Sequence, residues 1–234
     1  MKLPKYLLLI LNVFGILSFF YTVFLLNYGG TVLCALFFIL FYAFYFFERY
    51  FFTRKVWLLR CLFSCFLFCS IILGEVFGFY VKLSYWDDLM HFVFGVFSGL
   101  FLFYIFKNYF RCSFNTFILS IFVFSISITL SVFWEFFEFG MDRVFFFDMQ
   151  KDTVLQNVTS LDYDIHKSSN VYSIIYTDSG IYFFDGVLDI GLYDTMVDMF
   201  FNMCGIICGL FLFKYSKLWV FFCFYLLWCF FLVK

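Results

Sequence analysis

The stretch WDDLMHFVFGVFSGLFLFYIF, residues 86–106, decides how this chain folds. Most of it is apolar, and it is about as long as a helix that crosses the hydrocarbon core of a bilayer, which takes about 20 residues. Its first turns nevertheless carry Asp87, Asp88 and His91. An ionisable side chain inside a membrane costs about 2.5–3.5 kcal/mol on insertion scales and usually marks a functional site. This stretch therefore predicts a membrane-spanning helix with a polar site at its start.

The composition of the whole chain is typical of an integral membrane protein. Of its 234 residues, 65% are hydrophobic, and the mean hydropathy is +1.00, whereas soluble domains are about 45–50% apolar. We predict a single domain, residues 1–234, folded as an all-α polytopic bundle of about seven transmembrane helices. The second and the last of the predicted spans are short. The spans are 6–26, 31–47, 56–81, 88–106, 114–140, 191–213 and 218–233.

Basic residues near the ends of the spans indicate the orientation of the bundle, because they favour the cytoplasmic side. The apolar run of residues 6–26 is too long for the core of a signal peptide, so we interpret it as a retained first span. With the N-terminus inside, the cytoplasmic ends hold most of the basic residues: Lys2, Lys5, Arg49, Arg54, Lys55, Lys107, Arg111, Lys214 and Lys217. The outer side holds Lys82, Arg143, Lys151, Lys167 and Lys234.

The sizeable polar region of the sequence lies at residues 142–190, and we predict that it is an extracytoplasmic loop. Residues 171–177 and 181–184 favour two short strands on either side of a turn at Asp178, Ser179 and Gly180, so the loop is expected to contain a small β-hairpin. The loop also contributes Arg143 and Lys151, whose positive charges suit the phosphate of a substrate. The alternative for Arg143 and Lys151 is that they lie in an ordinary solvated loop and bind no substrate.

Two later spans carry polar side chains along one helical face near one end. Because consecutive spans run in opposite directions, these side chains and those of residues 87–91 come to the same side of the membrane. The charge bias makes this the outer side. We expect them to line one outward-facing pocket. The two faces consist of Ser127, Ser131, Glu135 and Glu138 on one span and of Asp194, Asp198 and Asn202 on the other.

Glycines continue two of these faces deeper into the membrane. Gly95 and Gly99 follow His91 in steps of four, and Gly205 and Gly209 extend the face of Asn202. Small residues let transmembrane backbones approach closely. We therefore expect tight packing below the pocket.

Several carboxylates and one imidazole in a shared pocket favour a bound cation, because like charges at short range do not all ionise without compensation. Oxygen ligands suit Mg²⁺, Mn²⁺ or Ca²⁺, and the histidine leaves Zn²⁺ or iron open. The candidate metal ligands are His91, Glu135, Glu138, Asp194 and Asp198. The candidate catalytic residues are His91, Glu135 and Asp198, with His91 a general base if no metal is bound. The candidate substrate ligands are Arg143, Lys151, Asn202, Asp87 and Asp88.

A purely structural interpretation stands beside the functional one for each of these residues. An acidic residue at a helix start often interacts only with the helix dipole or the membrane interface, as Asp87 and Asp88 would. Glu138 and Asp142 can also face water. Glu135 and Asp198 are flanked by apolar residues, so a role in the pocket is better supported for them.

Three motifs in this order resemble those of the VanZ-like superfamily of small bacterial membrane proteins, and within it the inner-membrane proteins of the YjdF type. Residues 87–91 are similar to its Asp-Lys-x-x-His step, with Asp88 in place of lysine. Residues 135–138 are similar to its Glu-x-x-Gln, with Glu138 in place of glutamine. Residues 198–209 match its Asp-x-x-x-Asn-x-x-Gly-x-x-x-Gly. The resemblance covers about residues 84–213 and implies a protein of the bacterial cytoplasmic membrane. It implies no particular reaction.

Three functions remain open from the sequence. The first is a cation-dependent enzyme that acts on a lipid or lipid-linked precursor of the cell envelope. The second is an ion- or proton-coupled transporter, which is less favoured because the sequence has no inverted repeat. The third is a non-catalytic membrane protein that binds an envelope component. The formal net charge of −1 gives no basic surplus for binding nucleic acid.

Overall fold

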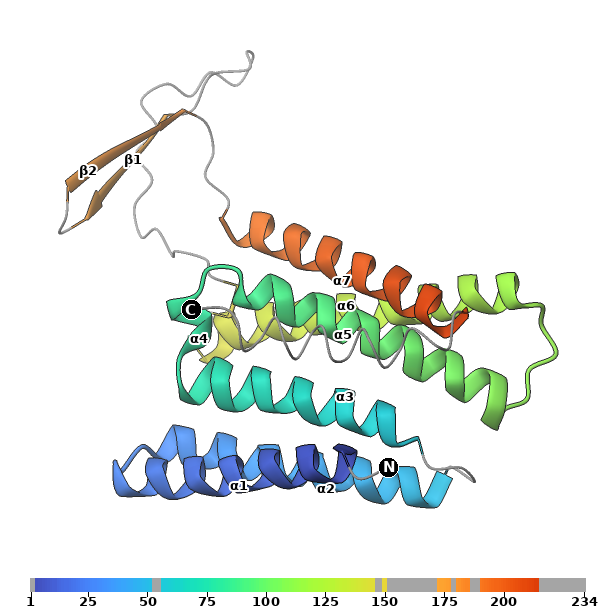
Figure 1. Cartoon of the computed structure of the whole chain (residues 1–234). Helices are drawn as coiled ribbons and strands as arrows, with labels where there is room; N and C mark the ends of the chain where they lie inside the picture. The colour runs from blue at the N-terminus through green and yellow to red at the C-terminus, as the bar shows by residue number, and fades with distance from the viewer. Residues whose placement is uncertain are drawn as a thin grey trace, which may run out of the picture. The chain divides into compact units, whose positions relative to one another are not determined.

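The protein is described here from a computed structural model, over residues 3–51, 56–145, 149–150, 172–177, 180–185 and 190–214. Within these ranges, six helices are long and apolar enough to cross a membrane (Figure 1). The chain is therefore a multi-pass membrane protein. The predicted seventh span, residues 218–233, lies outside the described residues. The six spans are Lys5–Phe24, Tyr28–Tyr50, Leu59–Val76, Trp86–Tyr109, Thr116–Val144 and Gly191–Phe213.

The described elements are helical except for one pair of strands. In chain order they are α1 (Leu3–Phe24), α2 (Tyr28–Phe51), α3 (Trp57–Leu67), the π-helix η1 (Phe68–Val76), α4 (Phe79–Lys82), α5 (Trp86–Tyr104), the π-helix η2 (Ile105–Tyr109), α6 (Thr116–Phe145), β1 (Tyr172–Thr177), β2 (Gly180–Asp185) and α7 (Ile190–Lys214).

Several predicted boundaries differ from the structure. The span predicted at 31–47 is longer, because the side chain of Asn27 caps α2 by accepting the backbone N–H of Gly30 at 2.9 Å. The span predicted at 56–81 ends early, because Gly78 takes a left-handed conformation with φ +70°. The predicted start of the outer loop, residue 142, belongs instead to α6, which continues to Phe145.

The described chain divides into two compact units, Met1–Ser131 with Asp198–Lys234, and Val132–Val197. The division falls within two continuous helices, α6 and α7. The single domain over residues 1–234 stays a prediction.

Aromatic side chains make up much of the core of the first unit. Phe37 of α2 is fully buried, and a Cβ atom at Gly15 of α1 would lie only 2.8 Å from its ring. Two turns further along α2, the ring centre of Phe44 lies 4.5 Å from that of Phe63 in α3. Large rings therefore join α1, α2 and α3, and α3 in turn packs against α5.

Helices α5 and α7 meet backbone to backbone at the predicted glycines. A Cβ atom at Gly95 would collide with the carbonyl oxygen of Asn202, and one at Gly99 would lie 3.0 Å from that of Ile206. The contact partners advance by four residues on both helices, so α5 and α7 run in the same direction. This is the close packing that small residues permit in membranes. The reciprocal contacts are those of Gly205 with Phe92 and of Gly209 with Val96.

Helix α6 follows α5 and η2 in the chain. The side chain of Asn115 caps α6 by accepting the backbone N–H of Ile118 at 2.8 Å. Near this end of α6, one apolar cluster joins the three helices α5, α6 and α7. Its members are Phe103, Leu119 and Val123, with Leu102, Phe106, Leu210 and Phe213 packed against them.

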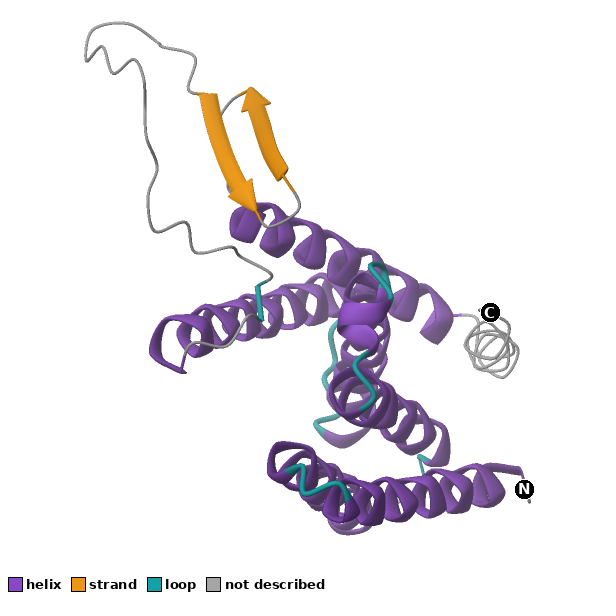
Figure 2. Ribbon diagram, turned by 90° about the vertical axis from the view of Figure 1, so that its left-hand side faces the viewer, coloured by secondary structure: helices purple, strands orange, loops and turns teal. Residues whose placement is uncertain are grey.

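The second unit contains an antiparallel β-hairpin (Figure 2). Strands β1 and β2 pair in register from Tyr172 opposite Asp185 to Thr177 opposite Gly180. The strands overlap the predicted runs at 171–177 and 181–184, but β2 begins at Gly180, which the sequence pattern places in the turn. Turn-forming residues separate two runs of β-branched and aromatic residues here, which is the usual hairpin pattern.

Candidate functional site

Helix α5 positions the first part of the site. Its first turn contains Asp87 and Asp88, and His91 follows Asp87 by one turn on the same face. Asp87 and His91 are buried, whereas Asp88 is half-buried. The helix therefore directs one carboxylate and one imidazole into the interior of the first unit.

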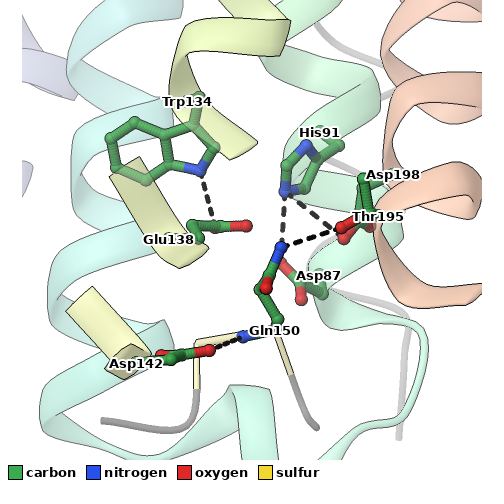
Figure 3. Close-up of polar contacts among 8 residues, drawn as sticks. All are labelled: Asp87, His91, Trp134, Glu138, Asp142, Gln150, Thr195 and Asp198. Atoms are coloured by element: carbon green, nitrogen blue, oxygen red, sulfur yellow. Dashed lines mark hydrogen bonds and ion pairs between the residues drawn. The ribbon is translucent and has the colours of Figure 1, made fainter. Parts of the chain in front are cut away.

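Helix α7 brings Asp198 to the same place. Nε2 of His91 lies 3.6 Å from Oδ1 of Asp87 and 3.8 Å from Oδ2 of Asp198 (Figure 3). One carboxylate oxygen of Asp87 and one of Asp198 lie within 4.8 Å of each other. The exposed fraction of Asp198 is 1%. Asp87, His91 and Asp198 are called the carboxylate–imidazole cluster below.

The distances in this cluster are longer than ordinary hydrogen bonds, which measure about 2.7–3.2 Å. They are close to the separation between neighbouring ligands of one metal ion. For tetrahedral zinc with ligands at about 2.0–2.2 Å, that separation is about 3.3–3.6 Å. The two distances from Nε2 of His91 are thus near the spacing of neighbouring ligands around a small cation.

Asn202 lies one turn after Asp198 on α7. Its exposed fraction is 1%, and neither its Nδ2 nor its Oδ1 has a hydrogen-bond partner among the described residues. The same is true of the hydroxyl groups of Ser127 and Ser131 on α6, which are also buried. These side chains belong to the first unit, as the cluster does.

The second unit contains a pair of buried glutamates on α6. Glu135 and Glu138 are 4% and 5% exposed, and one carboxylate oxygen of each lies within 4.8 Å of the other. Nε1 of Trp134 donates a hydrogen bond to Oε1 of Glu138 at 2.6 Å (Figure 3). A short hydrogen bond to a carboxylate is a strong one, so it fixes the orientation of Glu138. The interpretation that Glu138 faces water is therefore wrong.

Asp142, at the end of α6, is also buried rather than facing water. Its carboxylate accepts the backbone N–H groups of Met149 at 2.7 Å and of Gln150 at 2.9 Å. Nε2 of Gln150 in turn donates to Oγ1 of Thr195 at 2.9 Å (Figure 3). These bonds connect the end of α6 to the first turns of α7 within the second unit.

The sequence did not single out Trp134, Gln150 or Thr195 for these contacts. Trp134 and Glu138 are four residues apart on one helix, and this spacing is a usable signal for a side-chain pair. Gln150 and Thr195 are far apart in the sequence, and no local pattern predicts their contact.

The remaining predicted residues take different positions. Asp194 is half-buried, one turn before Asp198 on α7. Arg143 is exposed, with its guanidinium carbon 5.3 Å from the centre of the Phe139 ring. Lys151 lies outside the described residues. The structure thus brings together Asp87, His91 and Asp198 in one unit, and Glu135 with Glu138 in the other. Their roles as ligands stay predictions.

Comparison with known proteins gives one family. Residues 6–217 match the family described as "Predicted membrane protein (DUF2238)". No curated protein and no solved structure gives a significant match. The match agrees with the membrane fold but does not identify the VanZ-like superfamily or the YjdF type. Because it covers most of the sequence, the chain belongs to the DUF2238 family of membrane proteins.

Proposed function

We propose that this protein is a cation-dependent enzyme that acts on a lipid or lipid-linked precursor of the cell envelope. The observation that supports this most is the carboxylate–imidazole cluster, which lies within membrane-spanning helices. Ionisable side chains at such a depth are expensive and usually functional. Two aspartates lie beside one imidazole in this cluster, so two acidic groups are close together. A bound cation is the natural compensation.

The ligand chemistry restricts the cation to a few types. One imidazole nitrogen with several carboxylate oxygens suits Mn²⁺ or Zn²⁺, and oxygen ligands alone suit Mg²⁺ or Ca²⁺. We propose that Asp198 and His91 bind the cation from the first unit and that Asp87 binds substrate or completes the ligand set. Glu135, Glu138 and Asp194 are proposed as further ligands.

The proposed reaction takes place at the outer surface of the bacterial cytoplasmic membrane, with the N-terminus of the chain in the cytoplasm. A cation there would polarise a phosphoryl or carbonyl oxygen and make bound water more acidic. His91 would carry a proton, and Arg143 and Lys151 would bind a headgroup phosphate. Asp88 and Asn202 complete the proposed substrate ligands.

The direct test is metal binding by the full-length protein in detergent. We expect the purified protein to contain about one Mn²⁺ or Zn²⁺ per chain and His91→Ala to weaken cation binding at least about tenfold. The sequence has a second histidine, His166, so His166→Ala is the matched control and should bind as the wild type does. Equal cation content in wild type and His91→Ala, together with unchanged membrane lipids in cells, would refute the proposal.

A double-mutant cycle tests whether the glutamates of α6 bind the same cation. Glu135→Gln and Asp198→Asn should each weaken binding, and their combined effect should differ from the sum, because ligands of one ion act together. Additive effects, or no effect of Glu135→Gln, would restrict the cation site to the residues of the first unit.

An ion- or proton-coupled transporter is the second candidate, since intramembrane acids often carry protons or bind ions in transporters. The glycine contacts of α5 and α7 count against it. These two helices touch through their backbones one turn beyond the cluster, at Gly95 with Asn202 and at Gly205 with Phe92. Ion uptake into proteoliposomes that is abolished by Asp198→Asn would reverse this ranking.

A further inference from the structure

A second set of buried polar side chains lies on α7, one turn beyond Asp198, and on α6. It consists of Asn202 on α7 with Ser131 and Ser127 on α6, and is called the amide–hydroxyl layer below. Each side chain is at most 1% exposed. Among the residues that the structure describes, neither the amide of Asn202 nor the two hydroxyl groups have a hydrogen-bond partner. Buried polar groups in proteins almost always have one, from the protein or from a ligand.

Helix geometry places Asn202 and Ser131 at the same depth. Val123 of α6 and Leu210 of α7 both belong to the apolar cluster around Phe103. Asn202 precedes Leu210 by eight residues, and Ser131 follows Val123 by eight residues. At 1.5 Å per residue, both therefore lie about 12 Å from that cluster. Gly95 precedes Phe103 by the same number of residues.

The contact of α5 with α7 supports the same depth for Gly95 and Asn202, because Gly95 packs on the backbone of Asn202. His91 and Asp198 each lie one turn above this pair. The amide–hydroxyl layer is thus directly below two members of the cluster. Gly95 contributes no side chain at this level.

The chemistry of an amide limits what the layer can bind. A cation would satisfy Oδ1 of Asn202 and leave Nδ2 without a partner, and an anion would be repelled by Asp198 one turn away. A hydroxyl group both donates and accepts hydrogen bonds, as the amide and the serine hydroxyl require. We propose that Asn202 and Ser131 bind a neutral hydroxyl group directly below the cluster. Its source is either water or the alcohol of a glycerol or sugar headgroup, and only the second source rests on the proposed enzyme function.

Replacing Asn202 with an apolar residue of similar shape distinguishes two cases: an amide that binds a ligand and an amide that has no hydrogen-bond partner. If the amide binds nothing, Asn202→Leu removes a buried polar group that has no partner and should stabilise the fold. If the amide binds a hydroxyl group, the same change leaves that group and its other partners unsatisfied and should destabilise the fold.

The experiment measures the melting temperature (Tm) of the full-length protein in detergent without added lipid. We expect Asn202→Leu to lower Tm by about 3 °C or more and Ser131→Ala to lower it by less. Ser125→Ala is the matched control, because Ser125 is exposed on the same helix and its hydroxyl donates to the carbonyl oxygen of Ile121. An unchanged or higher Tm of Asn202→Leu would overturn the proposal. If that variant does not fold, equal Tm values for Ser131→Ala and Ser125→Ala would overturn it.

Two short-chain lipids distinguish the sources of the hydroxyl group. Phosphatidylglycerol carries a glycerol diol, and phosphatidylmethanol has the same charge without a hydroxyl group. A rise in Tm that only phosphatidylglycerol produces, and that Asn202→Leu abolishes, identifies the headgroup. Equal effects of the two lipids, with a destabilised Asn202→Leu, identify water. If the protein binds no metal but Asn202→Leu still lowers Tm, the hydroxyl site is supported and the proposed enzyme function is not.

Discussion

Individual side chains on the same helices have very different surroundings. Asp198 and Glu135 are almost fully buried, whereas Phe133 and Phe200 are more than half exposed. On a membrane-spanning helix, exposed aromatic side chains face lipid and buried carboxylates face the protein interior. The apolar neighbours of Glu135 and Asp198 therefore predicted their burial correctly. The burial of Asp142 was not predictable, because it depends on backbone groups of residues 149 and 150 that no helical pattern includes.

At this scale, Trp134→Phe should lower the free energy of unfolding by about 1.5–3 kcal/mol. The change removes the indole N–H that donates to Glu138 and leaves a buried carboxylate oxygen without that donor. Chemical unfolding in detergent measures the effect. Trp57→Phe is the control, since Trp57 is partly exposed on α3. Equal losses in the two variants would contradict a role for the hydrogen bond.

The affinity for the proposed cation should fall as the pH falls. Protons compete with the cation for the imidazole nitrogen and the carboxylate oxygens of the cluster, so acid weakens binding. Titration with Mn²⁺ at pH 8, 7 and 6 measures this dependence. In Asp198→Asn one competing group is lost, and the dependence should be shallower. Binding that is independent of pH would show that these groups are not ligands.

At the scale of elements, hydropathy located the described spans, and spacing located the face on which α5 and α7 meet. The ends of the helices were less accurate. They depend on single residues such as the capping Asn27 and the left-handed Gly78, whose effects a sliding average of hydropathy does not contain. The π-helix η1 was not predicted either, because its side-chain pattern differs little from that of an α-helix.

The glycine contacts predict a contrast between two alanine variants. Gly205→Ala should destabilise the fold by about 1–3 kcal/mol, because its Cβ would collide with the carbonyl oxygen of Phe92. Gly140→Ala on α6 has nothing within 4 Å of the new methyl group and should stabilise the helix by up to about 1 kcal/mol. Thermal unfolding measures both. Destabilisation by both variants alike would argue against specific packing of α5 on α7.

For the whole molecule, the apolar composition and the family match agree on a multi-pass membrane protein. The sequence also grouped the polar residues by helix face. It did not show which of them meet, because that depends on the rotation of each helix and on the choice of rotamers. The meeting of His91 with Asp87 follows from helical spacing alone, whereas its meeting with Asp198 required the packing of α5 on α7.

The orientation in the membrane is tested by enzyme fusions in a bacterial host. Alkaline phosphatase, which is active only outside the cytoplasm, should be active when fused after Lys82 and inactive when fused after Arg111. The reason is that α5 separates these two positions and the basic residues favour a cytoplasmic N-terminus. The reverse pattern would place the carboxylate–imidazole cluster at the cytoplasmic surface.

The direct contact of α5 with α7 also has a consequence for how the protein responds to its surroundings. Where two helices touch through their backbones at glycines, a small displacement opens a gap or causes an overlap of backbone atoms. The distance from His91 to Asp198 should therefore be insensitive to bilayer thickness and lateral pressure. The same spacing is expected in a thin membrane, a thick membrane and a detergent micelle.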